Sequence, residues 1–268
     1  MLTSLWNLNL SYNQIEDISV LDRLSKLDNL YLNGNKIKNL EPIMGLDIKK
    51  LQLNYNQIVN ISWLKNSDNL ISLKLSNNMI SKIPSRLFYN FESLQELDLS
   101  SNHIKLIDSI GCKQNKRFYV VDLSKNELEN VDFLQSCSSS LRQIKLNHNK
   151  ITNLSSANFF RYPNLRKIDL SYNPLEISQD IKIAENLFEI TLDANLVRSF
   201  INLQYNYLFK TTRKYLFYKT LTIRLHDQLN FVDCRLQIEF AKKNVLLNLF
   251  NAYQIDHFLS VCSKLDLS

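Results

Sequence analysis

Hydrophobic residues recur in one short pattern along most of this chain. Residues 94–104 show the pattern in full, as L-x-x-L-x-L-x-x-N-x-I. It returns at intervals of 21 to 24 residues, and each copy carries an asparagine; these are Asn13, Asn35, Asn56, Asn78, Asn102, Asn126, Asn149, Asn173 and Asn195. A pattern of fixed period is interpreted before any local signal, because it determines the whole fold.

Each copy predicts the same local structure. Alternating Leu-x-Leu, as at residues 97–99, predicts a short strand with one buried face. The asparagine that follows can hydrogen-bond the backbone of its own unit and of the neighbouring unit. One unit cannot bury its own apolar face, so the units must stack. The sequence therefore predicts an α/β solenoid with one parallel strand per unit.

The nine units resemble those of the leucine-rich-repeat family over residues 2–197. The resemblance implies a curved horseshoe, with the strands on its concave face and short helical or 3-10 turns on its convex face. From Asn13 to Asn78 the interval is 21 or 22 residues, as in phosphatase-regulator-type and internalin-type members. From Asn78 to Asn173 it is 23 or 24, as in extracellular members, where a Phe fills the convex core.

The pattern divides the chain into three parts. We expect a solenoid of nine repeats at 1–198, a degenerate repeat with an insertion at 199–235, and a helical C-terminal cap at 236–268. A tenth, degenerate unit includes Ile223 and Leu225. Residues 236–265 are rich in Leu, Phe, Ile and Val at helical spacing, including Phe240 and Leu247, which predicts helices that cover the end of the solenoid.

Residues around Cys234 resemble the cysteine-bearing C-terminal cap of extracellular family members. Asn230, Phe231, Cys234 and Leu236 fit that cap, but its first cysteine is missing. The usual two-disulfide cap therefore cannot form. The resemblance leaves one bridge, Cys234 to Cys262, and the alternative is a pair of reduced, buried cysteines. The first unit has no comparable cover, so we expect an N-terminal cap, with or without a signal peptide, outside this sequence.

Composition excludes several classes of protein. The formal net charge is +6, and the 32 basic residues are interspersed with 26 acidic ones, so nucleic acid is an improbable partner without a basic stripe. No apolar run approaches the ~20 residues of a transmembrane helix. Location stays open: an extracellular or cell-surface protein is favoured if the N-terminus is incomplete, and a cytoplasmic one otherwise.

The sequence offers no catalytic or metal-binding set. The four histidines fall in different repeats, the three glycines are isolated, and no C-x-x-C pair occurs. Asp98 and Asp122 are predicted to be neighbours on the sheet, but Leu-Asp-Leu-Ser is a common filler in this family. We therefore predict a protein that is not an enzyme and takes no cofactor, metal or small-molecule substrate.

The variable residues of the strands and their flanks are the predicted binding surface for a protein partner, because tyrosines among polar and charged groups are typical of such surfaces. These residues are Tyr12, Tyr31, Gln52, Tyr55, Lys74, Glu96, Asp98, Asp122, Lys145, His148, Asp169 and Tyr172. Sequons make Asn60 and Asn153 predicted glycosylation sites if the protein is secreted. A third sequon, at Asn9, would face the partner.

Two functions follow from these patterns. The first is a protein-interaction module, as the ectodomain fragment of a secreted or membrane-anchored recognition or adhesion receptor. The alternative is an intracellular scaffold or phosphatase regulator, which rests on the shorter repeats and on the missing signal peptide.

Overall fold

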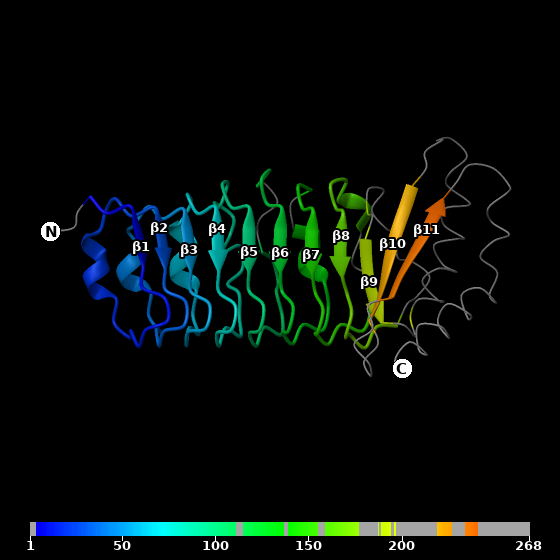
Figure 1. The fold of residues 1–268 in the computed structure, drawn as a ribbon, viewed down its shortest axis with the longest axis horizontal. Helices are drawn as coiled ribbons and strands as arrows, with labels where there is room; N and C mark the ends of the chain where they lie inside the picture. Colours follow the sequence, from blue (N-terminus) through cyan, green and yellow to red (C-terminus); the bar gives the residue numbers. More distant parts are fainter. Residues whose placement is uncertain are drawn as a thin grey trace.

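The computed structural model describes residues 4–110, 115–136, 139–154, 159–176, 187, 189–193, 196, 219–226 and 234–240. Within these residues the strands form one sheet, in which they lie side by side in chain order (Figure 1). The strands are β1 Asn7–Asn9, β2 Asn29–Tyr31, β3 Lys50–Gln52, β4 Ser72–Lys74, β5 Glu96–Asp98, β6 Val120–Asp122, β7 Gln143–Lys145, β8 Lys167–Asp169, β9 Glu189–Asp193, β10 Lys219–His226 and β11 Cys234–Phe240. Strands β1 to β10 are parallel, which confirms the predicted solenoid.

Between β1 and β8, the described residues show the chain returning from one strand to the next through a short segment, and we number each coil by its strand. Several returns contain a 3-10 helix, as predicted; these helices are η1 Ser19–Arg23, η2 Glu41–Ile43, η3 Ser62–Asn66, η4 Asp132–Ser136 and η5 Phe159–Arg161. An Asp or Asn two residues before the helix accepts a hydrogen bond from the first backbone N–H of η1 to η4. Such bonds satisfy donors that a short helix leaves open.

The core is one continuous apolar stack between the sheet and the returns. Leucines and isoleucines of the repeat are almost fully buried from coil 2 onward. Phenylalanine appears in the longer returns, as predicted: Phe88 and Phe91 are fully buried and pack edge to face with their ring centroids 5.1 Å apart. Phe133 and Phe159 are buried in later returns. The extra residues of these coils thus make room for larger side chains.

The repeat asparagines form the predicted internal ladder. Asn56 Nδ2 donates to the Leu53 carbonyl of its own coil at 3.0 Å and to the Leu32 carbonyl of the preceding coil at 2.9 Å. Its Oδ1 accepts from the Ile37 backbone N–H at 3.0 Å. The same pattern recurs up to Asn173. Each asparagine therefore satisfies backbone groups of two coils in the interior, where an unpaired polar group is costly.

The C-terminal strands match the sequence prediction in one respect and differ in another. Ile223 of β10 pairs with Ile190 of β9, so the predicted tenth unit is in register with the ninth. Residues 236–240 belong to β11, which runs antiparallel to β10, although the helical cap is predicted to begin there. Leu236, Ile238 and Phe240 alternate with polar residues, and this period of two favours a strand. The remainder of the predicted cap lies outside the described residues.

Candidate functional site

The strand register confirms the predicted column of side chains on the outer side of the sheet. The middle residue of each strand from β2 to β8 is buried, so its two neighbours project from the other side. The residues that follow the middle position are Asn9, Tyr31, Gln52, Lys74, Asp98, Asp122, Lys145, Asp169 and Thr191. The residues that precede it are Asn7, Asn29, Lys50, Ser72, Glu96, Val120, Gln143, Lys167 and Glu189. These two columns are called the strand face below.

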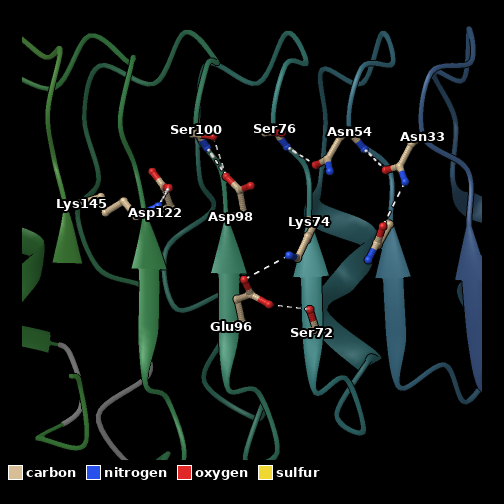
Figure 2. A network of polar contacts seen from close by, with 11 residues as sticks. Asn33, Asn54, Ser72, Lys74, Ser76, Glu96, Asp98, Ser100, Asp122 and Lys145 are labelled. Atoms are coloured by element: carbon tan, nitrogen blue, oxygen red, sulfur yellow. Dashed lines mark hydrogen bonds and ion pairs between the residues drawn. The ribbon is translucent and has the colours of Figure 1, made fainter. Parts of the chain in front are cut away.

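Charged groups of the strand face pair with one another. Figure 2 shows Glu96 between two residues of β4: one carboxylate oxygen lies 3.2 Å from Lys74 Nζ, and the other accepts from the Ser72 hydroxyl at 3.2 Å. Lys145 Nζ lies 2.9 Å from Asp122 Oδ2. Exposed ion pairs contribute little to stability, but they compensate charge across this part of the surface.

The column aspartates have a structural role at the ends of their strands. Asp98 and Asp122 are neighbours in register, as predicted. Asp98 Oδ1 accepts from the Ser100 hydroxyl at 2.6 Å and from its backbone N–H at 2.9 Å (Figure 2). Asp122 makes the same two bonds with Ser124. The recurring Asp-Leu-Ser sequence is thus explained by a turn that the aspartate carboxylate stabilises.

Lys145 lies between three carboxylates of the column. Partial burial opposes its charged form, but the hydrogen bond and the attraction to Asp122, helped by Asp98 and Asp169, raise the pKa of Lys145 above its ordinary value. Opposite charge at short range stabilises the protonated ammonium. This cation therefore pairs with Asp122 and is attracted at longer range to Asp98 and Asp169.

A left-handed backbone position follows each of the strands β1 to β8. The residues there have φ between 53° and 64°; they are Tyr12, Gly34, Tyr55, Asn77, Ser101, Lys125, His148 and Tyr172. They include four of the predicted partner-binding residues, which are Tyr12, Tyr55, His148 and Tyr172. Tyr12 is 79% exposed and Tyr55 is 58% exposed, while His148 stacks on Tyr172 with ring centroids 3.9 Å apart. The structure therefore places an aromatic and polar edge along the strand face.

One column was missed by the sequence analysis. The residue immediately before each strand lines the opposite edge of the strand face, and in coils 6 to 8 it is Tyr119, Arg142 and Arg166. The signal was present as an arginine at the same repeat position in two consecutive units. The two arginines indicate a shared surface only once the strand register shows that the two units are neighbours.

The predicted glycosylation sites both lie four residues after a repeat asparagine. Asn60 is exposed, and its Oδ1 accepts from the Ser62 backbone N–H at 2.8 Å. Asn153, also exposed, holds the equivalent position four residues after a repeat asparagine. The equivalent residues Asn39 and Asn130 make the same bond without a sequon. Stabilisation of a turn therefore accounts for an asparagine here, and glycosylation stays a prediction.

The remaining predicted features are only partly described. The backbone of Cys234 pairs with Leu225 across β10 and β11, whereas Cys262 lies outside the described residues, so the bridge stays a prediction. In the part of the chain that the structure describes, no three His, Cys, Asp or Glu side chains come together as a metal site. None of the described helices has the length and apolar character needed to cross a bilayer.

The chain is similar to known repeat proteins. A family model described as "Leucine rich repeat" matches residues 47–104, 116–175 and 139–197, together more than half of the chain. A zebrafish (Danio rerio) leucine-rich repeat-containing protein 3 is 35% identical over 120 residues, which are 44% of this chain and 42% of that protein. The leucine-rich repeat-containing G-protein coupled receptor 5 of Rattus norvegicus is 31% identical over 110 residues, 40% of this chain and 12% of the receptor. The matched segments thus span less than half of either relative.

Solved structures show the same fold. One match is an octameric complex of Latrophilin 3, Unc5D and the leucine-rich-repeat part of FLRT2, with a TM-score of 0.60 and 23% identity. It covers 72% of this chain and 61% of that chain.

Proposed function

Because the chain belongs to the leucine-rich repeat family, we propose that it is a non-enzymatic protein-interaction module whose strand face binds a protein partner. The observation that carries this proposal is the exposure of tyrosines that the fold does not need. Tyr12 and Tyr55 are 79% and 58% exposed beside the strand face. Large exposed aromatic side chains among polar groups are common anchors in protein interfaces.

The charge pattern supports the same function. Ion pairs such as Lys74–Glu96 and Lys145–Asp122 leave the middle of the strand face with mixed and largely compensated charge. A partner that docks there replaces exposed pairs with complementary contacts, which favours specificity and rate of association over raw affinity. The complex of FLRT2 with Latrophilin 3 and Unc5D provides a precedent for assembly by a chain of this fold.

Two variants test the proposal. The strand-face variant carries Tyr12→Ser, Tyr31→Ser and Tyr55→Ser, and the control variant carries Val20→Ser, Val59→Ser and Tyr89→Ser, which are 74%, 56% and 56% exposed in the returns. Both are screened with the unchanged chain against an array of purified receptor ectodomains and cytosolic proteins. We expect a partner that binds the unchanged chain and the control, and binds the strand-face variant at least tenfold more weakly, because about 1.4 kcal/mol of contacts is removed.

Two other outcomes would contradict the proposal. One is a partner that the strand-face variant retains and the control loses. The other is a turnover activity of the purified chain that Asp98→Asn or Asp122→Asn abolishes.

We further propose that the module is the ectodomain part of a receptor, with an intracellular scaffold as the alternative. The longer coils, the buried Phe88 and the receptor relative support the first; the shorter coils with η1 to η3 support the second. Secretion from cultured cells followed by glycosidase treatment separates them. We expect a loss of mass that Asn60→Gln diminishes. Asp132→Ser creates a sequon at the equivalent Asn130 and is the positive control; a shift with that variant alone would exclude glycosylation at Asn60.

A further inference from the structure

The residue before each strand forms a column whose charge changes along the solenoid. In coils 2 and 3 it is Asp28 and Lys49, which form an ion pair with Nζ and Oδ2 2.9 Å apart. In coils 6 to 8 it is Tyr119, Arg142 and Arg166. Backbone hydrogen bonds connect these three directly, from Arg142 N to Tyr119 O and from Arg166 N to Arg142 O, both at 2.8 Å.

Four cations lie in this column or just before it along the chain, and in the described ranges none has a carboxylate partner. The basic rim consists of Lys116, Arg117, Arg142 and Arg166, all exposed. In the described ranges, no ion pair joins any of them to an acidic side chain. Glu92 holds the position of Lys116 in the preceding coil, and Glu189 pairs with Lys167 instead. The rim therefore differs from the strand face, where opposite charges compensate.

Buried polar groups hold the rim backbone in place. Asn115 is 3% exposed, and its Nδ2 donates to the carbonyls of Phe91 and Leu94 at 2.6 and 2.7 Å. Its Oδ1 accepts from the backbone N–H of Arg117 at 2.7 Å. A cation is thus presented from a fixed backbone, which lowers the entropy lost when a ligand binds.

Tyr119, which lies beside the basic rim, positions one of its guanidinium groups. Arg142 Cζ lies 4.3 Å from the centroid of the Tyr119 ring, which is a cation–π contact. The N–H groups at the edge of a guanidinium remain available when its flat face is stacked. Neighbouring strands lie about 4.8 Å apart, so Arg142 and Arg166 offer two such groups in a row.

We propose that the basic rim binds a sulfated polysaccharide. Arginine donates paired hydrogen bonds to the oxygens of planar or tetrahedral anions. A row of cations with compensated surroundings matches a chain of regularly spaced sulfate groups better than a single anion. The rim lies outside the strand face, so this proposal does not rest on the binding of a protein partner there.

Features of the rim disfavour the other polyanions. Strands β6, β7 and β8 are each paired on both sides, so an acidic peptide has no free strand edge to extend. Non-specific single-stranded nucleic acid is recognised by aromatic faces on which bases stack. The ring of Tyr119, the aromatic residue described beside the basic rim, is already in contact with Arg142.

Heparin is the probe, measured with the full chain by calorimetry over a series of salt concentrations. The rim variant carries Arg142→Ala and Arg166→Ala. The control variant carries Lys26→Ala and Lys38→Ala, two exposed lysines on coil 2 that form no ion pair in the described part of the chain. We expect the rim variant to bind heparin roughly tenfold more weakly. The slope of log affinity against log salt is expected to fall by about one for each lost contact. The control should change affinity by less than about twofold.

Several outcomes would overturn the proposal. Equal losses in the two variants would show binding by overall charge, and no heparin binding at low salt would exclude the site. Polyglutamate or oligothymidylate of equal charge that binds as tightly as heparin would exclude a polysaccharide as the preferred ligand. Circular dichroism melting curves confirm that each variant is folded, so that a loss of binding reports on the rim.

Discussion

The first three coils and coils 4 to 7 share the same asparagine ladder, but different side chains are packed behind the sheet. Both place a buried asparagine between coils with the same hydrogen bonds. In the first three returns, Leu21, Ile43 and Leu64 fill the space behind the sheet. In three of the next four returns a phenylalanine is buried, namely Phe88, Phe133 and Phe159, and the interval grows from 21 or 22 to 23 or 24 residues. The backbone pattern is therefore independent of the side chains behind the sheet, and a longer return has room for a phenylalanine.

The largest expected effect on the free energy of unfolding comes from changing the side chains buried in the returns. Phe88→Ala should lower the free energy of unfolding by about 3–5 kcal/mol, because a fully buried ring and its contact with Phe91 are lost. Leu64→Phe should cost about 1–3 kcal/mol by overpacking a short coil. Urea denaturation measures both. Met79→Ala, at a position 49% exposed, is the control and should change stability by no more than about 0.5 kcal/mol. If Leu64→Phe left the free energy of unfolding unchanged, the claim that a short return has no room for a phenylalanine would be contradicted.

The ladder should respond equally in both regions. Asn56→Ala and Asn102→Ala each leave buried backbone groups without a partner, at roughly 1–3 kcal/mol for such a group. Denaturation should give losses that agree within about 0.5 kcal/mol. Asn13 is exposed, and its amide donates to the carbonyls of Leu10 and Ser11 in its own coil. Asn13→Ala should therefore cost less. Unequal losses of unfolding free energy for Asn56→Ala and Asn102→Ala would show that the ladder depends on the side chains buried in the returns.

In the column formed by the residue before each strand, the charge pattern of coils 2 and 3 can be exchanged with that of coils 6 and 7. Tyr119→Asp puts a carboxylate beside Arg142, as Asp28 stands beside Lys49, and should weaken heparin binding. Asp28→Asn frees Lys49 and should strengthen it. Stability should change by at most about 1 kcal/mol in each case, since exposed pairs contribute little. Heparin affinity chromatography measures the effect as the salt concentration of elution. Elution shifts of the same sign would contradict this prediction.

The smallest effect is a titration. The pKa of Lys145 is raised above its ordinary 10.5, so the pair with Asp122 stabilises the fold below the unfolded pKa and is lost as pH rises through the folded one. Asp122→Asn should lower the pKa of Lys145, because partial burial then acts with less compensation. NMR titration of the Lys145 side chain measures this shift. An unchanged pKa would show that Asp98 and Asp169 suffice.

Sequence alone predicts the scaffold of this protein because its determinants are local and repeated. The positions of Leu97, Leu99 and Asn102 within one unit fix a strand, its buried face and the turn after it. Stacking then follows from the need to bury that face. The same reasoning correctly placed the column through Asp98 and Asp122, since a strand alternates its side chains with a period of two.

The remaining features depend on contacts between units, which a single unit does not encode. The sequence predicts a helix for the alternating apolar residues of β11, because the residues that follow them have helical spacing. The sequence does not predict the edge at Arg142 and Arg166, because these arginines are 24 residues apart and become neighbours only through the register of the sheet. The internal pairing of Lys74 with Glu96 likewise depends on side-chain reach across two strands.

The left-handed position after each strand limits the order in which coils can be assembled. A Cβ on Gly34 would lie 2.7 Å from the ring of Tyr12, so a direct copy of coil 1 could not follow coil 1 without moving that tyrosine. His148 and Tyr172 show another solution, in which two flat rings stack. Duplication or shuffling of coils, in evolution or in a designed chimaera, must therefore match side chains at this position between neighbours. The repeat is modular in its backbone, and its junctions are specific.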